Sequence, residues 1–421
     1  MLAALLLLCL LAPSTADAHA VVVRTDPPDG CSPRAATSFA RGGPCPGGAI
    51  LPSAPPAVRI WFSEPVEPVA GGIAVLAPSG KRVERRPARA EGAELAVELD
   101  AAEEGTYLVS WRVVAEDTHA ARGGFAFSVG RASPPAADPG GAGEVGSVAP
   151  LGLALQVAAR WLHFLGYALG FGGLAFRAFV LRAPPPPVDR RLWRLVELGV
   201  VALLLAEPLA LLAQTTSLGA DAVLDPAVVG DALGSSFGRA LGQRLAAALL
   251  LWTLVGIARE RGDCFLWPGL ALGVALGALD GGSAHAASFR PVALGLLVNA
   301  VHLAAMGVWV GGLAALLVVW RPLGGARRSV SARFGRVAAT ALGVLAVSGA
   351  AMALVHLGAP LSGLATAYGA ALLGKLAALA AVVLLAWLAV GRARRWRALE
   401  AAGLTAVLAL AGLLVSLPPP R

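Results

Sequence analysis

One uncharged run, residues 292–320, limits what this chain can fold into more than any other feature. About 20 apolar residues, each rising 1.5 Å, cross a hydrocarbon core of ~30 Å as a single helix. The run therefore predicts a membrane-spanning helix. Comparable apolar runs lie at 152–180, 195–216, 242–258, 264–279, 337–356, 368–390 and 398–417. Together they predict an all-α polytopic bundle of about eight transmembrane helices over residues 151–421.

Composition and charge place the chain in the membrane class. Of its 421 residues 57% are hydrophobic and 14% charged, and the mean hydropathy is +0.71. The net charge of +8 does not indicate a nucleic-acid partner, because the arginines gather between the apolar runs, as the positive-inside bias produces. With the N-terminal part exported, the inner connections hold fifteen arginines. The outer loops and the tail hold four: Arg239, Arg244, Arg290 and Arg421.

The N-terminus predicts export. Residues 1–18 combine the apolar stretch Leu2 to Leu11 with the small-residue site Ala16-Asp17-Ala18, as in a secretory signal peptide. Cleavage there makes His19 the new N-terminus; an uncleaved anchor is the alternative. The expected location is the cytoplasmic (inner) membrane, multi-pass, with the N-terminal domain in the periplasm or another extracytoplasmic space.

Residues 19–130 show the pattern of strands. Short β-branched and aromatic segments at 57–62, 73–76, 94–99, 106–114 and 124–129 are separated by turn signals such as Pro27-Pro28-Asp29-Gly30, which predicts a β-sandwich. Residues 131–150, rich in Pro, Gly and Ala, predict a flexible linker. If the domain is exported, we expect a disulfide between Cys31 and Cys45, which flank a Pro/Gly/Arg-rich insert.

Two residue patterns in the exported domain suggest a metal site. Asp117-Thr118-His119 places a carboxylate and an imidazole on one side of an extended segment. A cleaved His19 adds an amine and an imidazole that can chelate. Nitrogen and oxygen ligands of this kind are what Cu(II) prefers. His19, Asp117 and His119 are therefore candidate Cu(II) ligands, with a solvated turn as the alternative.

The apolar runs also hold imidazole and thioether groups. Met306 and Met352 each lie four residues from a histidine, as His302/Met306 and Met352/His356, and an i, i+4 pair shares a helix face. Such soft and borderline ligands suit copper, although a gap-filling methionine and a hydrogen-bonded histidine would be purely structural. The remaining candidates for a copper path through the membrane are His163, His285, Asn299, which shares the His302/Met306 face, and Glu207.

Two ionisable groups in the runs need partners in the bilayer. Glu207 and Lys375 are costly there unless they face the bundle interior. We expect either that they pair with each other or that Glu207 carries protons or cations. Arg160, in the first run, is expected to extend outward along the helix.

The chain resembles a known family in both halves. Residues 19 to about 130 resemble the copper-resistance protein CopC. The shared features are His19-Ala20, the Pro-Pro-Asp-Gly turn, Phe62-Ser63-Glu64-Pro65-Val66, Gly105-Thr106-Tyr107, Trp111-Arg112-Val113 and Asp117-Thr118-His119. Residues 151 to about 417 resemble CopD, its membrane partner, through Ser283-Ala284-His285, His302-Leu303, Trp309-Val310-Gly311-Gly312-Leu313, Arg333-Phe334, Ser348-Gly349, Thr366-Ala367-Tyr368-Gly369 and Lys375.

The resemblance implies a cupredoxin-like (Ig-like) sandwich that binds Cu(II) through His19, Asp117 and His119, followed by a membrane domain that imports or handles copper. No ATP-binding loop of the GxxxxGK[ST] type occurs in the cytoplasmic connections, so energy from ATP would need a partner, and a channel or a potential-driven carrier is expected. We do not expect an enzyme. Copper ions, the lipid bilayer and other exported copper chaperones are the expected partners. Two alternatives remain: a haem-bearing membrane oxidoreductase with His163, His302 or His356 as axial ligands, and a copper scavenger or sensor that transports nothing.

Overall fold

The computed structural model describes residues 20, 22–28, 50–116, 118–134, 150–219, 222–282, 291–357, 361–389 and 394–417. These fall into two compact units. One holds the strands together with residues 211–239, and the other holds the helices of 154–210 and 240–421. The predicted signal peptide, most of the predicted linker, and Cys31 and Cys45 lie outside the described residues.

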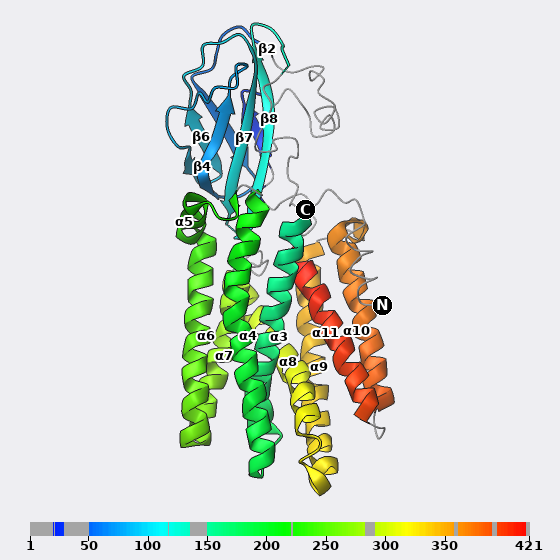
Figure 1. Ribbon diagram of the computed structural model, residues 1–421. Coiled ribbons are helices and arrows are strands. Elements are labelled where there is room, and N and C mark those ends of the chain that lie inside the picture. The colour runs from blue at the N-terminus through cyan, green and yellow to red at the C-terminus, as the bar shows by residue number, and fades with distance from the viewer. Residues whose placement is uncertain are drawn as a thin grey trace. The chain divides into compact units, whose positions relative to one another are not determined.

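The first unit contains two four-stranded sheets. The strands are β1 (Val22–Asp26), β2 (Ile50–Leu51), β3 (Ala57–Phe62), β4 (Val66–Leu76), β5 (Arg89–Glu91), β6 (Glu94–Glu98), β7 (Gly105–Ala115) and β8 (Ala120–Val129). One sheet has the order β1-β3-β6-β5 and the other β2-β8-β7-β4 (Figure 1). The two sheets form the predicted sandwich. The fold class is therefore confirmed, while β1, β2 and β5 are strands that the periodicity did not predict.

Aromatic side chains fill the core between the sheets. Tyr107 and Phe127 stack with ring centroids 5.1 Å apart, and Phe62 meets the edge of Trp111 at 5.0 Å. The Tyr107 hydroxyl donates to the carbonyl of Glu103 at 2.8 Å, and burial raises the pKa of this hydroxyl. A methyl group at Gly123 would lie 2.6 Å from the Trp111 ring. Gly123 thus leaves room on β8 for the indole of its cross-strand partner.

Strand β4 is longer than predicted because it contains a bulge. Ala70, Gly71 and Gly72 all have positive φ, and the register with β7 shifts between Pro68 and Ile73. Glycine adopts such angles without steric cost, and a bulge inserts extra residues without ending the strand. The periodicity from Ile73 onward predicted the second half of β4 only.

Eight helices occupy the positions of the eight predicted spans. They are α3 (Pro150–Phe179), α4 (Pro186–Leu218), α6 (Ser236–Arg261), α7 (Leu266–Gly282), α8 (Val292–Val319), α9 (Arg327–Leu357), α10 (Ala367–Ala389) and α11 (Arg394–Val415), with the short α5 (Pro226–Gly234) between α4 and α6. Among the described residues α4, α6, α8, α9 and α10 are long and apolar enough to cross a membrane, and α7 and α11 are shorter apolar helices. Helix α3 is in neither group, and its second half is almost wholly buried.

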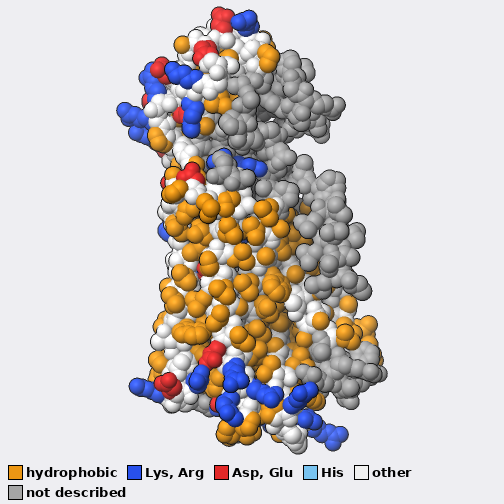
Figure 2. Space-filling model, viewed as in Figure 1, with side chains coloured by type: hydrophobic (Ala, Val, Ile, Leu, Met, Phe, Trp, Pro, Cys, Tyr) orange, Lys and Arg blue, Asp and Glu red, His pale blue; other side chains and the backbone are white. Residues whose placement is uncertain are grey.

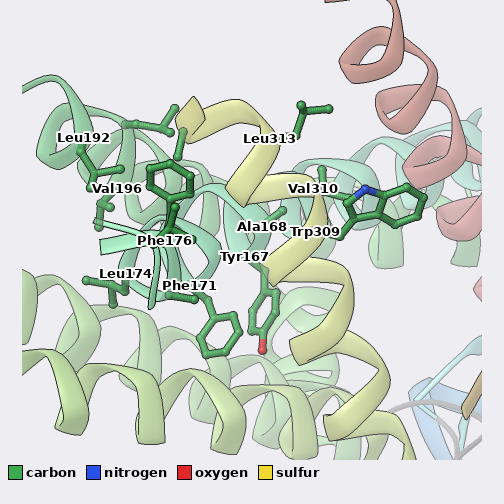
Figure 3. Close-up of a cluster of buried hydrophobic side chains, with 14 of the residues drawn as sticks. Tyr167, Ala168, Phe171, Leu174, Phe176, Leu192, Val196, Trp309, Val310 and Leu313 are labelled. Carbon is green, nitrogen blue, oxygen red and sulfur yellow. The ribbon is translucent and has the colours of Figure 1, made fainter. Parts of the chain in front are cut away.

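Glycines bring α3 into backbone contact with its neighbours. A methyl group at Gly311 would lie 1.7 Å from the carbonyl oxygen of Ala168, and one at Gly172 would lie 2.0 Å from that of Gly307. Gly199 on α4 approaches Gly170 in the same way. Small residues at helix contacts are what helix association in lipid requires, because it depends on close packing. Tyr167 and Phe171 of α3 and Trp309, Val310 and Leu313 of α8 belong to one buried hydrophobic cluster. Figure 3 shows Tyr167 on one side of α8 and the Trp309 ring on the other.

The surface of the helical unit fits a lipid environment. Figure 2 shows apolar side chains over its visible face, with Lys and Arg gathered at one end. Exposed arginines that belong to the predicted inner connections include Arg182, Arg190, Arg191, Arg194, Arg259, Arg261, Arg321, Arg327 and Arg328. This separation of charge from apolar surface is consistent with a multi-pass protein whose arginine-rich connections face the cytoplasm.

Candidate functional site

The candidate copper-binding turn of the sandwich joins β7 to β8. Ala115 and His119 close it through a backbone hydrogen bond from Ala115 N to His119 O at 2.9 Å, and Thr118 N donates to Ala115 O at 2.9 Å. Thr118 has a φ of 72°, an unusual angle for a β-branched residue. The His119 side chain is buried, with the residue 7% exposed. The turn thus holds the imidazole at the end of the sandwich.

The other two expected ligands, His19 and Asp117, lie outside the described residues. Within the described part of the chain, no group of three or more His, Cys, Asp or Glu side chains is arranged to hold a metal ion. Asp117 lies between Glu116 and Thr118 in the sequence. Ala20, which follows His19 in the sequence, is buried in the sandwich core. A buried imidazole is a ligand type that Cu(II) accepts, so His119 fits the expected donor set.

In the helical unit, His302 and Met306 of α8 both point into the protein. His302 Nδ1 lies 2.9 Å from the Ser348 hydroxyl of α9, and a methyl group at Gly349 would lie 3.3 Å from the His302 ring. Met306, one turn further on, is buried. Asn299 lies on the same stretch but donates to the carbonyl of Gly277 on α7 at 2.9 Å. The amide therefore contacts α7, while the imidazole contacts α9.

The second histidine–methionine pair lies near the C-terminal end of α9. His356 Nδ1 is 3.3 Å from the Tyr368 hydroxyl of α10, and the two rings meet edge to face. Both Met352 and His356 are partly buried. His285, the expected outer member of the path, lies outside the described residues.

A charged cluster that the sequence did not predict as a unit lies inside the helical unit. His163 on α3 places Nδ1 3.3 Å from Glu207 Oε1 on α4 and Nε2 2.9 Å from Asp280 Oδ2 on α7. Arg244 on α6 contacts the Glu207 carboxylate through Nε at 3.1 Å and Nη2 at 3.0 Å. We call these four residues, His163, Glu207, Arg244 and Asp280, the charged cluster. It joins four helices through charge-assisted contacts.

The charged cluster corrects three sequence-based expectations. Glu207 pairs with Arg244 and His163 rather than with Lys375, which instead interacts electrostatically with His302. Arg244 was expected in an outer loop, but α6 already begins at Ser236, so this arginine lies two turns inside the helix and is largely buried. The predicted run 264–279 left Asp280 in the following outer loop, but α7 continues to Gly282.

The positions of Arg244 and Asp280 inside helices could have been predicted from the sequence. Arg244 lies eight residues after Ser236, where α6 begins, and Asp280 is the single charged residue in the sequence of α7. A charged residue inside such a helix needs a partner of opposite sign. Glu207 was the visible partner for Arg244, but the sequence alone did not show that α4 and α6 are neighbours.

Comparisons with known proteins point to copper in both halves. A CopC domain model matches residues 45–130, and a model of the copper resistance protein D-like N-terminal domain matches residues 151–296. Copper transport protein CutJ of Bacillus subtilis (strain 168) is 27% identical over 394 residues, which cover 88% of this chain and 67% of that protein. Protein YobA of Escherichia coli (strain K12) is 35% identical over 85 residues, 19% of this chain and 68% of that protein. The crystal structure of CopC from Methylosinus trichosporium OB3b matches 28% of this chain and 98% of that chain at 22% identity, with a TM-score of 0.21.

Proposed function

Because the chain belongs to the CopC/CopD copper-resistance family, as a CopC domain fused to a CopD-like membrane domain, we propose that it binds copper outside the cytoplasmic membrane and carries it inward. The exported sandwich takes up Cu(II) through His19, Asp117 and His119. The helical unit then passes the metal across the bilayer. The role is transport in copper homeostasis or resistance, without catalysis.

One observation supports this proposal more than any other. Within the described part of the helical unit, every histidine and methionine is buried or partly buried rather than exposed toward lipid: His163, His302, Met306, Met352 and His356. A methionine placed only to fill a lipid-facing surface would be exposed. Imidazole and thioether groups that are not fully exposed to lipid can contact a cation that moves between the helices, and they are ligands that copper accepts.

The proposed membrane path uses His285, His302, Met306, Met352 and His356. His302 lies ten residues into α8, roughly 15 Å from its start. Its ring contacts the Ser348 hydroxyl and lies beside Gly349 of α9, and the positive charge of Lys375 also acts on it. For His163 and Glu207 the carboxylate and guanidinium contacts of the charged cluster support a different role.

Copper accumulation in cells tests the proposal. Cells that express the full chain are compared with cells that express the same chain carrying Asp117→Asn and His119→Ala, with membrane levels of both proteins matched. We expect higher copper accumulation with the unchanged chain at low external copper, and a loss of that increase in the variant. Equal accumulation in both would show that the sandwich does not supply the membrane unit. A protein that binds copper but raises accumulation in neither form would be a scavenger or sensor instead.

A further inference from the structure

The charged cluster is a buried group of ionisable side chains in the described part of the helical unit, and the proposed copper path does not use it. Its residues come from α3, α4, α6 and α7, and their side chains are at most 13% exposed. Ionisable groups in the interior of a membrane protein often mark proton or ion pathways. The burial of these four ionisable groups therefore suggests a function in addition to helix packing.

We propose that the charged cluster is a proton-binding site, which carries one proton on the His163 ring and releases it when a copper cation enters the helical unit. The inference deepens the proposed function and rests on it for the identity of the cation. The protonation of His163 is inferred from the contacts of its ring alone and does not depend on copper.

The count of formal charges supports the proton. Glu207 and Asp280 bring two negative charges, and Arg244 brings one positive charge. With a neutral imidazole the formal charge of these four side chains is −1, and a buried charge is costly unless it is compensated. A proton on His163 brings the formal charge of the four residues to zero.

The contacts of the ring support the same protonation state. Both ring nitrogens face a carboxylate oxygen, at 3.3 Å for Nδ1 to Glu207 and 2.9 Å for Nε2 to Asp280. A neutral imidazole has only one N–H group, so one of the two contacts would set a nitrogen lone pair against an ionised oxygen. The imidazolium donates from both nitrogens and satisfies both contacts.

Several contacts of the neighbouring helices are compatible with this state. Glu207 faces it from α4 and Asp280 from α7, and Arg244 of α6 acts on both carboxylates. On α3 itself the Tyr167 hydroxyl donates to the Gly273 carbonyl of α7, and Trp161 donates to the Thr405 carbonyl of α11. On α8, His302 is hydrogen bonded to α9.

Asp280 can accept the proton from His163 and release it to the exterior. It lies two residues before the last residue of α7, at the end that the distribution of arginines assigns to the exterior. In the release step the Nε2–H bond of His163 breaks, its electron pair stays on the nitrogen, and the proton passes over 2.9 Å to Asp280 Oδ2 and then to water. The cluster is left with one negative charge.

That negative charge links the cluster to copper. Helices α3 and α8 are in backbone contact at Gly172 and Gly307, and His163 and His302 both precede this contact on helices of the same predicted direction. A cation on α8 is repelled by the imidazolium and stabilised once the proton has left. By linkage, protons must weaken copper binding to the same extent that copper weakens proton binding.

Nitrogen NMR of the full chain tests the proton without copper. The chain has six histidines, and His163→Gln identifies the signal of His163. At neutral pH we expect an imidazolium signal for His163 in the unchanged chain and a neutral imidazole in Asp280→Asn, which removes the charge that requires the proton. Glu197→Gln is the matched control, since Glu197 forms an exposed α4–α6 pair with Arg259, and it should leave the imidazolium in place. A neutral His163 in the unchanged chain would overturn the proposal.

Proton release on copper binding tests the coupling. Cu(I) is added to the purified full chain in weak buffer with a pH-sensitive dye. We expect Asp280→Asn and His163→Gln to release about one proton fewer per bound copper than the unchanged chain and Glu197→Gln. Equal release in all four would overturn the coupling. If His302→Leu/Met306→Leu binds as much copper as the unchanged chain, the proposed copper path along α8 is wrong. The NMR experiment still shows whether His163 is protonated, because it uses no copper.

Discussion

His163 Nε2 lies 2.9 Å from Asp280 Oδ2, although 117 residues separate the two side chains. This contact joins α3 to α7, and the second ring nitrogen joins α3 to α4 through Glu207. The helical unit is therefore held together by charge at this level and by glycine contacts further along α3. We therefore expect different effects from substitutions in the charged cluster and at the glycine contacts.

Glu207→Gln should destabilise the protein far more than Glu197→Gln. Both carboxylates pair with an arginine of α6, but the Glu207 side chain is 3% exposed and that of Glu197 is 29% exposed. Loss of one partner leaves Arg244 charged and buried, which costs about 3–5 kcal/mol, whereas loss of an exposed pair costs about 1 kcal/mol or less. Thermal unfolding of the two variants in the same detergent measures the difference. Equal shifts of Tm would contradict the burial of the charged cluster.

Gly311→Ala should prevent α3 and α8 from packing. The added methyl group would meet the carbonyl oxygen of Ala168 at 1.7 Å, and backbone atoms on both sides cannot move aside independently. We expect a large loss of monodisperse protein by size-exclusion chromatography. Gly343→Ala on α9 is the control, because a methyl group there has open space within 4 Å, and its elution profile should not change. A normal profile for Gly311→Ala would show that the two helices are further apart.

His119→Ala should lower the Cu(II) affinity of the exported domain without unfolding it. The backbone hydrogen bonds that close the turn, from Ala115 to His119 and from Thr118 to Ala115, do not use the imidazole. The expected loss is about tenfold to 100-fold, the scale of one ligand's contribution to a site. Glu116→Gln, an exposed neighbour in the same turn, should bind as the unchanged chain does. Competition with a coloured chelator measures the affinities.

Cu(II) binding by the same domain should weaken as pH falls. The proposed ligands are the His19 amine, two imidazoles and a carboxylate, and each must lose its proton before it can bind metal. Protons therefore compete with Cu(II), and affinity rises with pH through the range in which amines and imidazoles titrate. The same chelator competition over a series of pH values checks this. An affinity independent of pH would exclude the amine and the imidazoles as ligands.

The sequence predicted those parts of the structure that depend on local pattern. Periods of apolar residues placed the helices and most long strands. The segment with His119 was expected to be extended, but it is a turn in which Thr118 has a φ of 72°. The charged cluster depends on which helices are neighbours, and nothing in the local pattern around Glu207 indicates whether Lys375 or Arg244 is its partner. The start of α6 was also missed, because Arg239 and Arg244 made that segment resemble a loop.

Copper uptake into proteoliposomes that contain the full chain tests the central claim most directly. We predict that the unchanged chain and Val301→Leu, a substitution at an exposed position of α8, take up copper above protein-free vesicles. His302→Leu/Met306→Leu should fall to the level of those vesicles. The double variant should still fold, because the Ser348 hydroxyl keeps its hydrogen bond to the Val344 carbonyl at 2.6 Å. Uptake by the double variant equal to that of the unchanged chain would contradict a copper path along α8.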